Sequence, residues 1–346
     1  MQVPAVDFAH LHRMSDDHGT FEHAHYSTPR PEHGYCTDDM ARVLIVTTRH
    51  GPGDAEVHHL AHLALRFLAA ALGPDGGMRN RMNRYGAWED EPAFEDAWGR
   101  GLWGLGFAAA HSGLASVRRS AREQFTKAAG GRSVWPRAMA FAALGAAELL
   151  SAQPDHLAAR ALLVDAAAAM PGEATDAAWP WPEARLSYAN ATVPDSMIAA
   201  GVALGRPDLL VRGLSLLAWL LEHETLDGHL SVTAVGGAGP GESGPAFDQQ
   251  PIEVAALADA CVRAAGVEAP PGWAPRRDVD WYAGLGAATA WFLGDNDAGA
   301  VMWDPLTGGG YDGLEVAGVN LNQGAESTLA LLSTLQHAHQ LRAARQ

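Results

Sequence analysis

The sequence has 346 residues, of which 48% are hydrophobic and 18% charged, enough apolar material for one large core or two ordinary ones. Its net charge of −16 argues against nucleic acid or a membrane surface as a partner, since both require clustered Lys and Arg. The two cysteines are too few for a disulfide framework and the first residues carry no signal-peptide pattern, so we expect a reducing, cytoplasmic location.

Taken in chain order, the hydrophobic pattern predicts two kinds of helix that alternate along the chain. The first kind is amphipathic: in 54–72, Leu60, Leu63 and Phe67 fall on one face, and Gly73 ends the helix. Further amphipathic helices are expected at 115–128, 155–169, 207–223 and 278–293. No apolar run approaches the ~18 residues that a membrane span needs.

The second kind of helix is rich in Ala and Gly, is apolar nearly all round, and begins with polar residues. Such a pattern is typical of a buried helix. We expect six of these helices, at 37–46, 95–110, 135–150, 194–205, 248–261 and 322–335.

Six buried helices that alternate with amphipathic ones predict an all-α (α/α)6 barrel with an inner and an outer ring. The inner helices of such a barrel run parallel, so their polar starts meet at one mouth. Long loops lead into the inner helices at 73–94, 178–193, 226–247 and 300–321, and the alternating stretch 229–235 predicts a β-hairpin. No linker divides the chain, and we expect one catalytic domain over residues 1–346.

The residues around the helix starts resemble a bacterial family. The stretches that carry the resemblance are "HGYCTDDMAR", "EDAWGRGLWGLG", "FDQQPIEVAAL" and "VNLNQGAESTLALL", and the likeness extends over nearly the whole chain. Members of this (α/α)6 family resemble glycoside hydrolases and are found beside, or fused to, glycosyltransferases and mannoside phosphorylases. The resemblance implies a carbohydrate-active barrel, an oligosaccharide or glycoside substrate, and a functional link to a glycosyltransferase.

The resemblance also points to particular residues at the mouth. They are Asp38, Asp39, Arg42, Arg79, Asn80, Glu95, Asp96, Arg100, Asp248, Gln249, Gln250, Glu253, Asn322, Gln323 and Glu326. Met40 and Trp98 depart from the family pattern, which often has Asn and His at these places. We keep Trp98 as a substrate-binding candidate and expect the polar contacts around it to differ.

Asp38 and Asp39 stand directly before the apolar run of the first inner helix. They can cap the helix and pair with Arg42, or one of them can act as a general base or accept a sugar hydroxyl. Adjacent helical residues point about 100° apart, so we expect at most one of them to face the scissile bond.

Glu95, Asp96 and Arg100 repeat this form on the next inner helix. Asp96 stands four residues before Arg100 and is expected to pair with it, which leaves Glu95 to act as the general acid. Carboxylates on two neighbouring helices can flank a glycosidic bond, and by analogy with barrels of this type we expect inversion of configuration.

Acids and amides mark the last two inner helices. Asp248 comes shortly before Pro251, so helix capping and catalysis are equally open for it. Glu326 is either catalytic or a buried structural acid. The amides can donate to and accept from sugar hydroxyls; they are Gln249, Gln250, Asn322 and Gln323.

The loops supply further candidates for substrate binding. Arg79 suits an anionic group on the substrate, and Asn80 follows it. Trp181 and Tyr188 can stack on a sugar ring, or else pack their own loop. His23 lies near the mouth, but the histidine clusters lack the spacing of a metal site, so we expect no metal and no cofactor.

These patterns favour a glycoside hydrolase that works by paired carboxylates. The nearest alternative is a sugar epimerase or isomerase on the same barrel, which usually relies on two histidines as acid and base. The helix starts carry Asp, Glu and Gln instead, and this favours hydrolysis. A non-catalytic glycan-binding partner of a glycosyltransferase is the third reading.

Overall fold

The computed structural model describes residues 3–170, 172, 176, 178–242, 244–270, 273 and 279–345. In these ranges it contains twelve α-helices and four two-stranded antiparallel sheets, and no helix there is long and apolar enough to cross a membrane. The chain forms two compact units. The first unit comprises residues 8–170 and 203–205, and the second unit comprises 1–7, 171–202 and 206–346.

The elements follow one another in simple order. Up to residue 170 they are α1 (Ala9–Arg13), β1 (Ala24–His25), β2 (Thr28–Pro29), the 3-10 helix η1 (Pro31–His33), β3 (Tyr35–Cys36), α2 (Thr37–His50), α3 (Ala55–Ala71), β4 (Arg81–Met82), α4 (Asp96–His111), α5 (Ala115–Ala128), α6 (Pro136–Ala152) and α7 (Leu157–Ala169). The remainder are α8 (Thr192–Leu204), α9 (Pro207–His223), β5 (Thr225–Leu226), β6 (His229–Leu230), α10 (Pro251–Ala265), α11 (Trp281–Phe292), β7 (Gly313–Glu315), β8 (Gly318–Asn320) and α12 (Ala325–Ala344).

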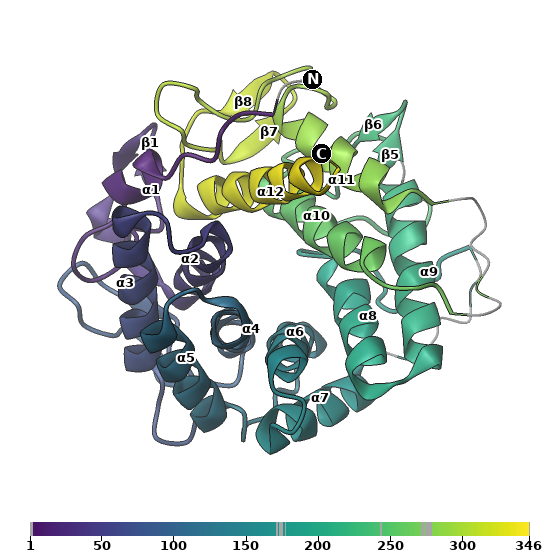
Figure 1. Cartoon of the computed structure of the whole chain (residues 1–346). Coiled ribbons are helices and arrows are strands. Elements are labelled where there is room, and N and C mark those ends of the chain that lie inside the picture. Colours follow the sequence, from purple (N-terminus) through teal and green to yellow (C-terminus); the bar gives the residue numbers. More distant parts are fainter. Residues whose placement is uncertain are drawn as a thin grey trace. The chain divides into compact units, whose positions relative to one another are not determined.

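The two predicted kinds of helix are both present in the first unit. Thirteen of the 17 residues of α6 are buried, whereas only 4 of the 14 residues of α5 are, in one stripe that runs from Val117 to Ala128. Figure 1 shows α4 and α6 nearly end-on, with α5 and α7 as a second layer beside them. Each apolar helix therefore packs against an amphipathic one, as α2 does against α3 and α4 against α5.

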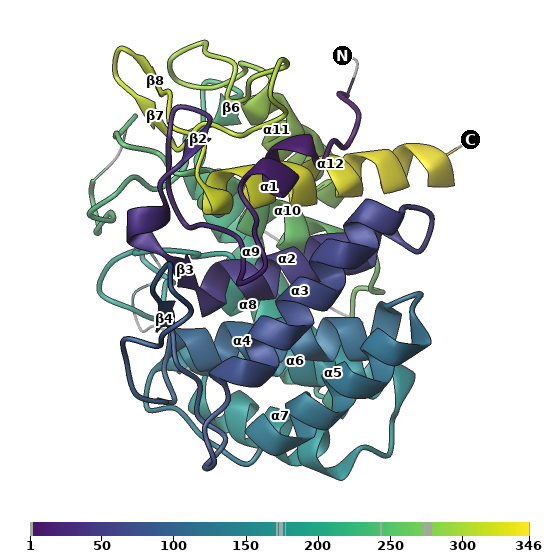
Figure 2. The ribbon, with the colours of Figure 1, turned by 90° about the vertical axis from the view of Figure 1, so that its left-hand side faces the viewer.

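Helices α2, α4 and α6 run parallel and in close contact, and Figure 2 shows them side by side. A Cβ atom at Gly99 of α4 would lie 2.3 Å from the carbonyl oxygen of Ala138 in α6, and one at Gly106 would lie 2.0 Å from that of Gly145. A Cβ at Gly104 would likewise lie 2.8 Å from the carbonyl oxygen of Ala41 in α2. Because contacts advance together along both partners, the amino-terminal ends of the three helices lie on the same side of the unit.

Residues from a distant loop fix the start of α2. Strand β3, just before the helix, pairs with β4 of the loop that precedes α4. The Thr37 backbone N–H donates to both oxygens of Asn80, and the Thr37 hydroxyl donates to the Arg79 carbonyl at 2.6 Å. The loop thus satisfies groups that the first helical turn leaves unpaired.

Helix α10 is the centre of the second unit, where it packs against α9, α11 and α12. It begins at Pro251, three residues later than the sequence pattern predicts, because Gln249 is in extended backbone that pairs with Leu314 and Ala234. Proline at the first helical position has no N–H to leave unpaired and fixes this start. Helix α12 likewise begins three residues after the predicted start.

Most of the predicted elements are confirmed with small shifts in their ends. All six apolar helices and all five amphipathic helices are present. The predicted hairpin in 229–235 is only partly correct, because β6 forms its pair with β5, which comes before the predicted stretch. The prediction of one domain over 1–346 remains a prediction.

The close approach of α4 and α6 yields a stability test. Gly106→Ala should lower the free energy of unfolding by about 1–3 kcal/mol, because the new methyl group overlaps the backbone of Gly145. Gly286→Ala in α11 is the matched control, since no described atom lies within 4 Å of its Cβ position. The control should be neutral or stabilise the helix by up to about 1 kcal/mol. Urea unfolding of both variants measures the difference, and equal effects would contradict the proposed helix contact.

Candidate active site

The adjacent acids at the start of α2 have different surroundings. Asp39 is 2% exposed; one of its oxygens accepts from Arg42 at 2.7 Å and the other from the Cys36 thiol at 3.2 Å. Burial, together with the Asp39 charge, raises the pKa of the Cys36 thiol well above its usual range. Asp39 and Arg42 thus form the expected ion pair, buried within the helix layer.

Asp38 points elsewhere and keeps a quarter of its side chain exposed. Its carboxylate lies 3.8 Å from the Arg100 guanidinium of α4. A nearby guanidinium stabilises the charged form of a carboxylate. The pair at the start of α2 therefore divides as expected, with one acid buried against Arg42 and the other partly exposed.

The start of α4 presents two further carboxyl groups in the same unit. Glu95 is exposed and occupies the N-cap position, and Asp96 is half-buried in the first turn. Arg100 is buried, and its guanidinium lies 4.1 Å from the centre of the Phe141 ring. The Arg100 guanidinium forms an ion pair with Asp38 on the neighbouring helix, and the predicted pairing of Arg100 with Asp96 stays a prediction.

Backbone groups of the loop before α4 accept hydrogen bonds from the start of α2. Asp90 accepts from the backbone N–H groups of Asn80 and Arg81, at 2.6 and 3.0 Å, and so fixes the turn that caps α2. Arg79 and Asn80 are both half-buried. Arg81 forms an ion pair with Glu22, and Glu22 also lies 3.8 Å from the imidazole of His23. A mixed cluster of acids and bases therefore surrounds the start of α2.

Two of the predicted aromatic contacts are core residues. Trp98 is fully buried, and its indole N–H donates to the carbonyl oxygen of Ala128. Trp181 is 1% exposed, and its indole N–H donates to Glu183 while its ring stacks on Trp219. We do not assign these two side chains to substrate binding, because neither indole ring has a solvent-exposed face on which a sugar could stack. Tyr188 is 44% exposed and stays a candidate.

In the second unit, Asp248 has an unusual environment for a carboxyl group. Its Oδ1 atom is buried and has no hydrogen-bond partner among the described residues. A Cβ atom on Gly313 would lie 1.9 Å from this oxygen, so the carboxyl group packs directly against the backbone of β7. Burial, together with the charges of Glu315 and Asp312, raises the pKa of Asp248. The N-cap of α10 is Gln250, so the prediction that Asp248 caps the helix is wrong.

Gln249 is a structural residue. It is fully buried and donates to Asp297 at 2.5 Å and to the Ala246 carbonyl, and it accepts from the indole of Trp291. Burial alone would raise the pKa of Asp297, but hydrogen bonds from Ser231, Gln249 and His229 outweigh it and lower the pKa. Gln249 therefore organises the loop, whereas the half-buried Gln250 beside it remains open to a ligand.

Of the candidates at the start of α12, one holds the fold together and two remain candidates for contact with a ligand. Gln323 is buried, accepts from the Thr307 hydroxyl at 2.6 Å and donates to Asp304, so it holds the preceding loop. Asn322 and Glu326 are half-buried. Asp312 accepts from the Gly324 backbone N–H and anchors the start of the helix. Asn322 and Glu326 stay candidates, while Gln323 serves the fold.

Two buried carboxyl groups interact in the second unit. Glu253 of α10 accepts from the backbone N–H groups of Ala189 and Asn190 and holds the segment that leads into α8. Glu224 accepts from the backbone N–H and the hydroxyl of Thr233. Burial, together with the Glu253 charge, raises the pKa of Glu224 to about 8. Glu253 is thus a structural residue here, and its charge adds to the effect of burial in favouring the protonated form of Glu224.

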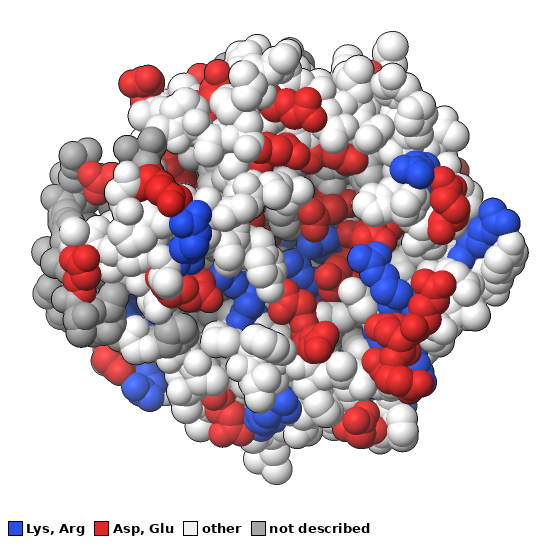
Figure 3. Space-filling model, turned by 180° about the vertical axis from the view of Figure 1, so that it is seen from behind, with Lys and Arg blue, Asp and Glu red and all other residues white. Residues whose placement is uncertain are grey.

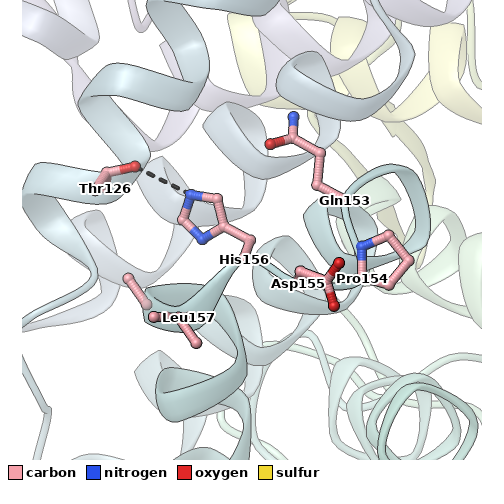
Figure 4. Close-up of a pocket in the computed structure, with 7 residues that line it drawn as sticks. Thr126, Gln153, Pro154, Asp155, His156 and Leu157 are labelled. Atoms are coloured by element: carbon pink, nitrogen blue, oxygen red, sulfur yellow. Dashed lines mark hydrogen bonds between the residues drawn. The ribbon is translucent and has the colours of Figure 1, made fainter.

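A pocket of about 660 Å³ lies in the first unit, away from the predicted residues. Figure 4 shows it between the end of α5 and the connection from α6 to α7, with His156 bonded to Thr126 at 3.2 Å. The other ring nitrogen of His156 accepts from the Ala159 backbone N–H and caps α7. Burial lowers the pKa of His156, consistent with a neutral ring that can accept. These contacts serve the helix ends.

The distribution of charged residues on the surface, and the arrangement of side chains that could bind a metal ion, can both be described. Figure 3 shows Asp and Glu scattered over one face with Lys and Arg among them. In the described ranges, no group of three or more His, Cys, Asp and Glu side chains is arranged as metal ligands.

The sequence analysis missed several polar residues of the candidate site. Arg137 is buried as the second residue of α6 and follows the same pattern of polar helix starts, so the pattern itself could have identified it. Glu22 and Arg81 are 59 residues apart, and no local spacing connects them. Asp297 is buried against Gln249 through contacts between two loops, which a sequence pattern does not show.

Comparison with known proteins shows the fold of this chain. No protein-family model matches the sequence, and no curated protein matches it either. A sugar epimerase from a ruminal bacterium is similar over 96% of this chain and 95% of its own, with 13% identity and a TM-score of 0.67. Cellobiose 2-epimerase from Bacillus thermoamylovorans is similar over 95% of each chain, with 10% identity and a TM-score of 0.68.

A hydrolase is also among the similar structures. The endoglucanase CelQ from Clostridium thermocellum, complexed with cellotriose, is similar over 92% of this chain and 63% of its own, with 10% identity and a TM-score of 0.59. The fold of this chain is therefore the all-α (α/α)6 barrel class, as the sequence pattern predicted.

The different surroundings of Asp38 and Asp39 at the start of α2 can be tested by stability measurements. Asp39→Asn should lower the free energy of unfolding by about 3 kcal/mol or more, because it removes one charge from a buried pair. Asp38→Asn should cost much less, because Asp38 is partly exposed. Urea denaturation of both variants measures this, and losses of equal size would refute the structural role of Asp39.

Glu224 yields a prediction for stability against pH. Its pKa of about 8 in the folded protein lies above the ordinary 4.5, so the folded state keeps a proton that the unfolded state releases. The stability contributed by this proton is full below pH 4.5 and is lost as the pH rises through 8. Glu224→Gln should flatten that slope in urea unfolding, whereas Glu222→Gln, which changes an exposed acid two residues earlier in the last turn of α9, should keep it. An unchanged slope in Glu224→Gln would overturn the assignment.

Proposed function

We propose that this protein is a carbohydrate-active enzyme that hydrolyses an oligosaccharide or glycoside with carboxyl groups as acid and base. Two observations support this: the fold of the chain is one on which the similar structures are named as sugar epimerases and an endoglucanase, and Asp38 is a partly exposed carboxylate beside Arg100. The link to a glycosyltransferase and the cytoplasmic location belong to the same proposal.

Asp38 is the observation on which the proposal depends. It lies at the end of the first unit where α2, α4 and α6 all begin, and the positive ends of the three helix dipoles favour negative charge there. The Arg100 guanidinium lies 3.8 Å from this carboxyl group. A partly exposed carboxylate can take a proton from water as a general base, or accept a sugar hydroxyl.

Glu95 is the candidate for the general acid that acts with Asp38. It is exposed in the same unit as Asp38, at the start of the neighbouring helix. Asp248 is a separate catalytic candidate within the second unit, where burial and the charges of Glu315 and Asp312 raise its pKa. Amide variants test the two residues independently.

Inversion of configuration belongs to the same proposal, by analogy with barrels of this type. It requires an acid and a base separated by about 6.5–9.5 Å, which leaves room for a water molecule, whereas retaining enzymes hold the two groups at about 5–5.5 Å.

A sugar epimerase or isomerase is the second candidate. Two similar structures are named as sugar epimerases and cover nearly all of this chain. The exposed rings of His23 and His33 lie 4.8 Å apart just before α2, and Glu22 lies 3.8 Å from His23. Imidazoles near a carboxylate can remove and return a proton beside a sugar carbonyl.

The test screens defined gluco- and manno-oligosaccharides and free sugars, with anomer-resolved NMR of the products in D2O. Asp38→Asn should lower kcat by about 100-fold or more while ligand affinity is kept, because the amide cannot accept the proton. Glu95→Gln should show a similar loss as the acid that acts with Asp38, and Asp248→Asn tests the separate candidate of the second unit by the same readout. Asp17→Asn, an exposed acid of the first unit, should leave kcat unchanged.

Other outcomes of this screen decide against hydrolysis. Solvent deuterium at the carbon beside the carbonyl, with loss of turnover in His23→Gln but not in Asp38→Asn, would establish the epimerase. Sugar binding by the wild-type protein without turnover on any sugar would instead indicate a glycan-binding protein.

A further inference from the structure

Trp135 is far more exposed to solvent than a tryptophan side chain normally is. It is 57% exposed and is the one exposed tryptophan in the described part of the chain. Burying a large aromatic side chain gains several kcal/mol, so folding alone does not explain why this ring faces water. Exposed tryptophans with a fixed position are common anchors of binding sites.

The backbone presents Trp135 in a fixed way. It occupies the N-cap position of α6, and Pro136 restricts the chain directly after it. The Trp135 backbone N–H donates to the Ser133 hydroxyl at 3.1 Å, and the Ser133 N–H donates to the sulfur of Met139 at 3.3 Å. Val134 beside it is 86% exposed and extends the apolar surface. The ring is therefore held at the start of an otherwise buried helix.

The helix register places Trp135 relative to Asp38. Gly99 of α4 contacts Ala138 of α6, so Trp135, three residues before Ala138, is level with Asp96, three residues before Gly99. Asp38 is level with Gly101, five residues further along α4. Along the helix axes, the backbone of Trp135 therefore lies about 8 Å beyond that of Asp38, with α4 between the two helices that carry these residues. All three helices belong to the first unit.

We propose that Trp135 is the stacking platform of a sugar subsite, where it binds a pyranose ring of the substrate beyond the ring that reacts near Asp38. The C–H groups on one face of a pyranose are apolar and pack on an indole, while its hydroxyls remain in water. This deepens the proposed function and rests on it. The substrate then has at least two sugar rings, since a free monosaccharide cannot reach both places.

Another exposed aromatic side chain fits this role less well. Tyr85 is 74% exposed in the loop after β4, but the guanidinium of Arg84 lies 4.8 Å from its ring centre and covers one face. Tyr85 therefore has a partner within its own loop.

The test is calorimetric titration of gluco- and manno-oligosaccharides of one to four units into the wild-type protein, Trp135→Ala and Trp135→Phe. The Ala variant should bind the longer oligosaccharides about tenfold or more weakly and the monosaccharide unchanged. Trp135→Phe, which retains an aromatic face, should lie between the two. Tyr282→Ala removes an exposed aromatic of α11 and should bind like the wild type.

The outcomes distinguish the subsite from the function. If Trp135→Ala keeps the wild-type dependence of affinity on chain length while Asp38→Asn still lowers kcat by about 100-fold or more, the subsite is wrong and the function stands. If the wild-type protein binds none of these sugars, both are overturned. A melting temperature of Trp135→Ala equal to that of Trp135→Phe would show that lost affinity is not lost folding.

Discussion

The first unit depends on the close parallel contact of α2, α4 and α6. Glycines at this contact let backbones approach to distances that any Cβ atom would prevent, as at Gly99, Gly106 and Gly145. Parallel packing brings three positively polarised helix ends to one side, and acids gather there because that field favours them. The polar site and the apolar core are therefore consequences of the same packing.

Loops hold the helix starts in place through their backbone groups. Thr37 of α2 is capped by a loop more than 40 residues away, and Gln249 before α10 is paired with Leu314. Many polar residues at the helix starts therefore make hydrogen bonds that hold the loops and are not available to a ligand. What remains at least partly exposed is a smaller set, and its carboxyl groups are Asp38, Glu95, Asp96, Asp248 and Glu326.

The buried acids of this chain have two kinds of surroundings, which act differently on the charge of the carboxyl group. Asp39 forms a buried ion pair with Arg42, whereas burial, together with the nearby Glu253 charge, raises the pKa of Glu224 to about 8. Asp248 is intermediate: it is half-buried, and two neighbouring acids disfavour its ionisation. A carboxyl group that holds its proton more firmly than its neighbours is suited to donate it.

The sequence by itself determined the helices and their alternation, because apolar periodicity follows directly from which face is buried, as in α5 and α6. It also predicted that Asp38 and Asp39 would diverge, since neighbouring helical residues point about 100° apart. Only the tertiary structure decided which of them stays accessible, that Arg100 contacts Asp38, and that Trp98 and Trp181 are buried while Trp135 is not. Those facts depend on contacts between residues far apart in the chain, which no local spacing encodes.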